Sequence, residues 1–197
     1  MNETIQNPKI KREKLHEGYG FIPYQRTDIF LYSQLTPPEI IRKVIEIEQP
    51  IHADELYKRV VTVFGAQKVS AKTQRSVLTA IRTPDSFNRC LYDDIQYDGY
   101  FVKMKTFDKL QVRVPNKNDK YVRSVQHVPD DELGMAMMII AKTTDGITPE
   151  NLFIETAREF GFKKAGESDI DSIRKAYRKL LRAEKVKEVD GNVYVMC

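Results

Sequence analysis

Arginine and lysine side chains recur on one predicted helix, over residues 168–183, at positions that its apolar residues leave free. A 3–4 spacing of apolar residues marks the buried stripe of this helix: Ile170, Ile173, Tyr177, Leu180 and Leu181. The remaining positions carry cations: Arg174, Lys175, Arg178, Lys179 and Arg182. These side chains point away from the stripe, and guanidinium and ammonium groups bind phosphate. The spacing therefore predicts an anion-binding helix face.

The rest of the charge pattern points the same way. The net charge is only +4, but residues 174–188 hold seven Lys/Arg against two Glu, and residues 104–127 hold six Lys/Arg against two Asp. Such segregation is typical of a protein with one anion-facing side. Further candidate contacts share exposed positions in predicted helices or links: Lys72, Arg75, Arg82, Arg113, Lys163 and Lys164. The alternative is a set of ordinary solvated helix faces.

Residues that could support catalysis or hold a metal are few and scattered. His16, His52 and His127 lie far apart in the chain, and no Cys/His pair has the spacing of a metal site. Acidic pairs occur at 93–94 and 130–131, where a strand edge and a helix N-terminus explain them. No glycine-rich phosphate loop occurs. We therefore predict no catalytic residue, no metal and no cofactor, and interpret His52 as a residue that begins a helix.

An internal repeat organises the chain. When the sequence is aligned with itself at an offset of 96 residues, Ile51 matches Ile147, Leu56 matches Leu152, and Phe64-Gly65 matches Phe160-Gly161. At an offset of 92 residues, Asp98-Gly99 matches Asp190-Gly191. Asp-Gly is a turn sequence typical of a β-hairpin. The sequence therefore predicts two copies of one small module.

Each copy is predicted to contain three helices and a hairpin. In copy one the first helix follows Thr36-Pro37, the second covers 53–64 with Phe64 facing inward, and the third covers about 72–82. In copy two the helices begin near Pro129, Thr148 and residue 168. The hairpins are expected over 91–102 and 186–195.

This order predicts a mainly α fold of the α+β class, built as tandem winged-helix-like repeats. The alternative is a plain helical repeat whose hairpins are only loops. We divide the chain into an N-terminal extension (1–35), copy one (36–103), a basic linker with one strand at 110–114 (104–127) and copy two (128–197). Aromatic residues between 19 and 32 are expected to pack against copy one. The chain has no apolar stretch long enough to span a bilayer, no secretory signal and only two cysteines, so we expect a cytoplasmic protein.

Two segments resemble a known domain. Glu48-Gln49-Pro50-Ile51-His52, followed by Phe64-Gly65, resembles the E-G-P-I-H segment of a bacterial and archaeal domain of unknown function. Phe160-Gly161-Phe162 and the residues up to Gly166 look like its G-F-x-R-x-G segment. That domain typically lies at the C-terminus of superfamily-one DNA helicase-like proteins, often with a very-short-patch-repair-like endonuclease domain. The resemblance covers roughly residues 24–196 and implies a DNA-processing setting without any catalytic residue; Gln49 departs from the family's Gly.

Two functions remain open from the sequence. In the first, the third helix of each copy binds nucleic acid, with duplex DNA as the expected partner, and the linker cations add phosphate contacts. In the second, the chain is a protein-interaction module that docks onto a helicase or nuclease, and the acidic early part of copy two faces a basic partner. That acidic part comprises Asp130, Asp131, Glu132, Glu150, Glu155 and Glu159.

Overall fold

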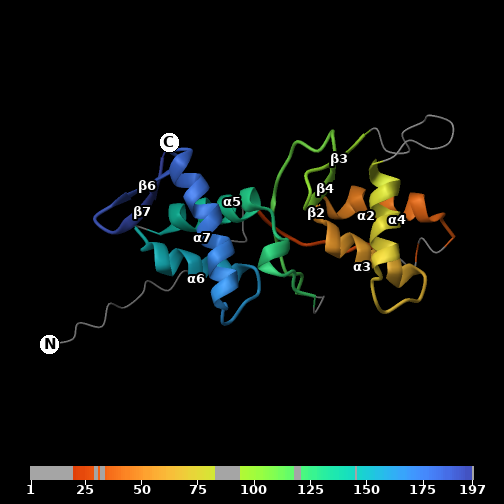
Figure 1. The fold of residues 1–197 in the computed structure, drawn as a ribbon. Coiled ribbons are helices and arrows are strands. Elements are labelled where there is room, and N and C mark those ends of the chain that lie inside the picture. Colours follow the sequence, from red (N-terminus) through yellow and green to blue (C-terminus); the bar gives the residue numbers. More distant parts are fainter. Residues whose placement is uncertain are drawn as a thin grey trace. The chain divides into compact units, whose positions relative to one another are not determined.

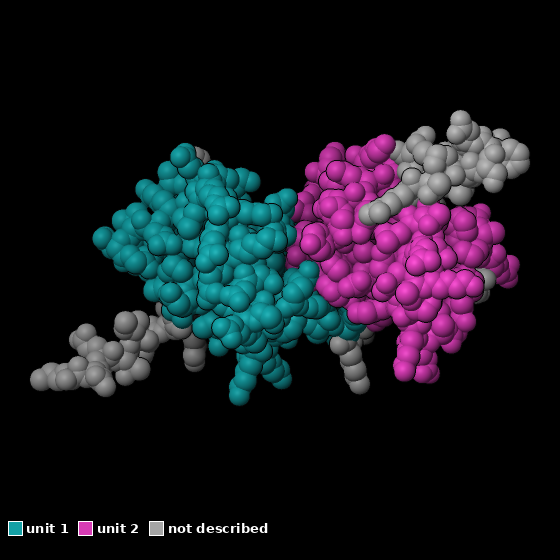
Figure 2. Space-filling view, in the orientation of Figure 1, with its two compact units in different colours: residues 1–23, 111–126, 130–197 teal, residues 24–110, 127–129 magenta. Residues whose placement is uncertain are grey.

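A computed structural model describes residues 20–28, 31, 34–82, 94–117, 121–144 and 146–196, with the side chain of Arg82 excepted. Within them the chain forms six α-helices and seven short strands (Figure 1), which makes an α+β protein. It divides into two compact units (Figure 2): unit 1 holds 1–23, 111–126 and 130–197, and unit 2 holds 24–110 and 127–129. Cys90, His16 and the first three residues of the strand predicted from residue 91 lie outside the described residues.

Unit 2 follows the order predicted for copy one. Helices α2 (Pro37–Glu48), α3 (Ala53–Val63) and α4 (Ala71–Arg82) pack beside a sheet of order β2 (Ile51–His52), β4 (Phe101–Met104), β3 (Ile95–Tyr97). All three strands are antiparallel to their neighbours, and Ile51 pairs with Val102. The core includes aliphatic residues from every helix: Ile40, Val44, Ile45, Leu56, Val60 and Val77. Burial of these side chains is the main force that holds the unit together.

Unit 1 repeats that order. Helices α5 (Asp130–Thr143), α6 (Pro149–Glu159) and α7 (Glu167–Arg182) are followed by the hairpin of β6 (Val186–Val189) and β7 (Asn192–Val195). Ile147 forms an antiparallel bridge with Val193, as Ile51 does with Val102 in unit 2. Leu133, Leu152 and Ile173 are fully buried, one from each helix. The order of elements is thus the same in both units.

The hairpin turns differ between the units. In unit 1 the turn is Asp190-Gly191, and both residues have positive φ (49° and 76°), as a two-residue turn of this kind requires. In unit 2 the two turn residues are Gly99 and Tyr100. Asp98 lies just before the turn, where its backbone N–H donates to the carbonyl of Phe101. The predicted Asp-Gly turn is therefore right for the second hairpin and one residue out for the first.

A strand pair in unit 1 was not predicted. Strand β5 (Val112–Val114) lies where the sequence indicates one, but it pairs in parallel with β1 (Phe21–Pro23). Phe21 therefore belongs to unit 1, whereas Tyr24 lies in unit 2, where its hydroxyl donates to Glu48. The expectation that the N-terminal aromatic residues pack against copy one holds for Tyr24 and is wrong for Phe21.

Glycine ends the second helix of each unit in the same way. Gly65 and Gly161 have φ of 69° and 96°, and each is followed by a backbone N–H that bonds five residues back, to Val61 and Ala157. A Cβ at Gly65 would meet nothing within 4 Å, but one at Gly161 would lie 2.9 Å from Pro115 Cγ.

We expect Gly65→Ala to lower the free energy of unfolding by about 1–2 kcal/mol, the usual strain of a left-handed residue with a Cβ. Gly161→Ala should cost at least about 1 kcal/mol more, because its methyl group also overpacks the site. Denaturation of both variants in urea, followed by far-ultraviolet circular dichroism, checks the difference. Equal losses would contradict the close contact at Gly161.

None of the described helices is both long enough and apolar enough to cross a bilayer.

Candidate functional site

The cationic face predicted on the third helix of copy two is present on α7. Ile173, Ala176, Tyr177 and Leu180 are buried on one side of the helix. The side chains of Lys175, Arg178, Lys179 and Arg182 are exposed, and Arg174 is partly so. Because successive residues are turned by about 100° around the axis, these five cations occupy the side opposite the buried stripe. The prediction that these cations lie on the side of the helix away from the buried stripe is therefore correct.

Three of the five cations are held by acids. Lys175 and Lys179 both reach Asp130 Oδ2, at 3.2 and 2.7 Å, and Arg174 bonds to Asp171. Arg178 and Arg182 form no ion pair with any described residue. Exposed pairs contribute little stability, so a phosphate could displace them at small cost. The face therefore keeps a positive excess.

Other cations are exposed on segments next to α7 in the sequence of unit 1. Lys163 and Lys164 are exposed in the segment that leads into α7, and Lys185 and Lys187 are exposed at and beside β6. In unit 2, Lys72 and Arg75 are exposed on α4, and the side chain of Arg82 lies outside the described part. Unit 2 therefore presents a sparser cationic face than unit 1.

Arg113 does not belong to an exposed surface. It is buried, and its Nη2 lies 2.6 Å from Glu132 Oε2, while Arg123 Nη2 lies 2.6 Å from Glu132 Oε1. Strand β5 is buried at all three of its residues. The prediction that Arg113, and Arg123 as one of the linker cations, contact phosphate is therefore wrong, because both guanidinium groups pair with a carboxylate in the core.

The predicted acidic surface of copy two is also incorrect in part. Glu132 and Glu159 are buried, and Asp130 is occupied by two lysines of α7. The early part of copy two therefore does not present the six acids as one surface.

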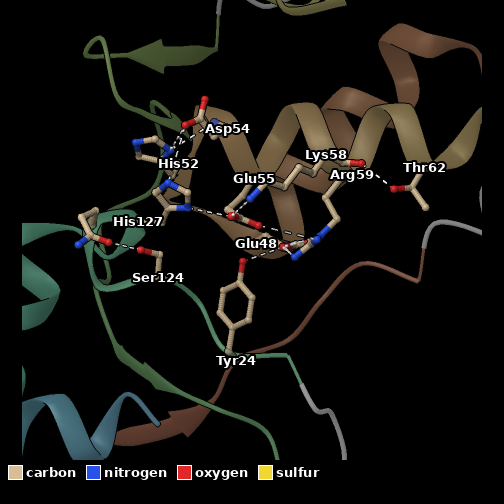
Figure 3. Close-up of polar contacts among 11 residues, drawn as sticks. Tyr24, Glu48, His52, Asp54, Glu55, Lys58, Arg59, Thr62, Ser124 and His127 are labelled. Atoms are coloured by element: carbon tan, nitrogen blue, oxygen red, sulfur yellow. Dashed lines mark hydrogen bonds and ion pairs between the residues drawn. The ribbon is translucent and has the colours of Figure 1, made fainter. Parts of the chain in front are cut away.

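A cluster that the sequence did not predict lies at the start of α3 in unit 2 (Figure 3). His52 is the N-cap of α3 and its Nδ1 accepts from the backbone N–H of Asp54 at 3.2 Å, which confirms its predicted role as a helix-starting residue. His127 ends the 3-10 helix η2 (Val125–His127) and stacks on His52, with ring centroids 4.0 Å apart. No local pattern signals this pair, because the two histidines are separated by most of unit 2 in sequence.

The imidazoles are surrounded by carboxylates. His127 Nδ1 lies 2.8 Å from Glu55 Oε1, and both His127 Nε2 and His52 Nδ1 lie 3.8 Å from Asp54 Oδ2. Burial lowers the pKa of His52, and the neighbouring His127 lowers it further. His52 is therefore neutral at pH 7, when its ring keeps a lone pair.

A buried charge network lies next to this cluster. Glu48 is fully buried and accepts from Arg59 Nε at 3.0 Å, from the Tyr24 hydroxyl at 2.7 Å and from the backbone N–H of Thr27 at 2.9 Å. Glu55 is bonded to Lys58 at 2.9 Å. These contacts fix the first two turns of α3, and with them the carboxylate that holds His127.

An apolar pocket opens elsewhere on unit 2. It has a volume of about 270 Å³ and is lined by residues of α2, α3 and α4, among them Ile41, Val60 and Val77. Phe64 also lines this pocket, and although the sequence predicts that it faces inward, its side chain is 57% exposed. The prediction for Phe64 is wrong, although its counterpart Phe160 is buried.

Comparison with known proteins gives one partial match. Residues 38–75 match a family described as a protein of unknown function (DUF3320). This range includes the Glu48–His52 segment and Phe64-Gly65, but not Phe160–Gly166. No curated protein and no solved structure matches the chain.

Proposed function

We propose that the chain is a non-catalytic nucleic-acid-binding module, with double-stranded DNA as its partner, in a helicase- or nuclease-type DNA-processing system. The observation that carries the proposal is the exposed cationic face of α7, opposite the buried stripe. Cations exposed on such a face can contact the phosphates of a duplex, and the release of the counterions bound to those phosphates favours binding.

The architecture supports the same proposal. In each unit a third helix is followed by a hairpin, and an extended segment after the first helix pairs with that hairpin. A winged helix has these parts in this order, and in DNA-binding members its third helix enters the major groove while the wing meets the backbone. We therefore propose tandem winged-helix-like units, in which unit 1 makes the stronger contact.

Salt dependence tests this function. With five phosphate contacts from α7, the slope of log affinity against log salt is about −4.5, so affinity for a labelled duplex falls about 500-fold between about 50 and 200 mM salt. Fluorescence anisotropy measures this, with an RNA duplex as competitor. A change of only about fourfold, which corresponds to one contact, would contradict the proposal.

The second candidate function is a protein-interaction module. The apolar pocket of unit 2 and the exposed ring of Phe64 at its edge favour it, because apolar side chains of a partner gain free energy when they are buried there. Steep salt dependence of duplex binding discriminates the two, since an apolar contact is insensitive to salt in this range.

A further inference from the structure

The two stacked histidines and Asp54 bring three metal-ligating side chains together. One donor atom from each of His52, Asp54 and His127 lies within 4.8 Å of the others. All three belong to unit 2, and two of them are fixed by the first turn of α3. Zinc binds imidazole nitrogens and carboxylate oxygens at about 2.0–2.2 Å, so ligand atoms around one tetrahedral ion lie roughly 3.3–3.6 Å apart. The donor atoms of the metal-free cluster, two pairs of which are 3.8 Å apart, would therefore move slightly closer together on binding.

The hydrogen bond between His127 and Glu55 selects the ring nitrogen that would bind. An ionised carboxylate only accepts hydrogen bonds, so Nδ1 of His127 is the donor in the 2.8 Å contact with Glu55. In the neutral ring the lone pair is then on Nε2, the atom that lies 3.8 Å from Asp54 Oδ2. A carboxylate that holds the far nitrogen of a ligating histidine is the usual support of a protein metal site.

His52 supplies the third ligand atom. Its Nδ1 carries a lone pair, because it accepts from the backbone N–H of Asp54. An ion bound to Nδ1 would displace this N-cap bond, which is worth about 1 kcal/mol. Asp54 and Glu55 supply two negative charges beside the site, and these offset the positive end of α3.

We propose that His52, Asp54 and His127 form a binding site for a zinc-class divalent transition-metal ion. The rings are stacked at an interplanar angle of 12°, so one of them must turn before both lone pairs can point at the same ion. Two imidazoles and one carboxylate then leave a fourth, tetrahedral position for water. Hard ions such as Mg²⁺ prefer oxygen ligands and are excluded by the two nitrogens. The site does not depend on the cationic face of α7, which belongs to the other unit.

Isothermal titration of the metal-free full chain with Zn²⁺, in the presence of a phosphine reductant, tests the site. We expect one ion bound per chain, no heat from Mg²⁺, and a visible absorption band when Co²⁺ is used. Asp54→Asn is the decisive variant, because this side chain is 53% exposed and we expect the substitution to leave the circular dichroism spectrum unchanged. It should weaken Zn²⁺ at least tenfold, since even residues that only support a ligand change metal affinity by about 10–100-fold.

Asp108→Asn is the matched control, because it removes the same charge from an exposed position outside the cluster, and it should bind Zn²⁺ as the parent chain does. Nuclear magnetic resonance gives a second readout: Zn²⁺ should shift Nε2 of His127 in the parent chain. The proposal is overturned if Zn²⁺ does not bind, if Asp54→Asn binds as tightly as Asp108→Asn, or if the ring nitrogens of His127 do not respond.

Discussion

Glu132→Gln lowers the free energy of unfolding of unit 1 by about 3–5 kcal/mol, the usual cost of removing one partner from a buried ion pair. The carboxylate of Glu132 is fully buried and forms ion pairs with two guanidinium groups, those of Arg113 and Arg123. It also accepts from the backbone N–H of Arg113 at 2.8 Å, which fixes β5 against α5. A neutral amide would remove the buried negative charge that both guanidinium groups contact.

Hydrogen exchange followed by mass spectrometry locates the effect. We expect faster exchange in α5, α6 and α7 of Glu132→Gln, with α2 and α3 unchanged. Asp171→Asn is the control, because it breaks an exposed pair with Arg174 and should cost less than about 1 kcal/mol. Equal exchange in the two variants would show that Glu132 does not hold the core of unit 1.

The same carboxylate makes unit 1 sensitive to acid. Burial alone would raise the pKa of Glu132, but Arg123 and Arg113 outweigh it, so the pKa lies below its ordinary value. A depressed pKa contributes stability that is fully present above the unfolded-state value, about 4.3. This stability is lost as the pH falls through the folded-state value. Glu132→Gln should therefore flatten the loss of stability below about pH 4.

Local features of the fold were predictable from the sequence. Gly65, Gly161 and Gly191 all have the positive φ that their positions at helix ends and a turn suggest. The buried stripe of α7 and the capping role of Thr148 also follow from residues close in sequence. These signals depend on the helical period and on backbone conformations that only a few residue types adopt.

Features that depend on distant residues were not predictable. The alternating sequence of β5 predicts a strand with Arg113 exposed. In the structure β5 pairs with β1, and Arg113 bonds to the carboxylate of Glu132, so that all three residues of the strand are buried. The pair of His52 and His127 has the same cause, since the start of α3 and the 3-10 helix η2, which are distant in sequence, bring the rings together. Nothing local to either segment carries this information.

Arg174→Ala, Arg178→Ala and Arg182→Ala together remove one row of the cationic face of α7. None of the three belongs to the buried residues of the helix, so the chain should fold with an unchanged circular dichroism spectrum. Each lost phosphate contact removes about 0.9 from the salt slope and about an order of magnitude in affinity at 50 mM salt. The triple variant should therefore bind duplex roughly 10³-fold more weakly.

The matched control removes three cations elsewhere: Lys43, Lys68 and Lys142. It has the same net charge as the triple variant, so any difference between the two reports position rather than total charge. We expect the control to keep nearly the affinity and the salt slope of the parent chain, because these lysines lie outside α7.

The most direct test is the salt slope of duplex binding, measured by fluorescence anisotropy for the parent chain, the arginine triple variant and the lysine control. A slope that is shallower by about 2.7 in the arginine variant alone is the expected result. The same slope in both variants, or an arginine variant that binds duplex as the parent does, would contradict binding through α7.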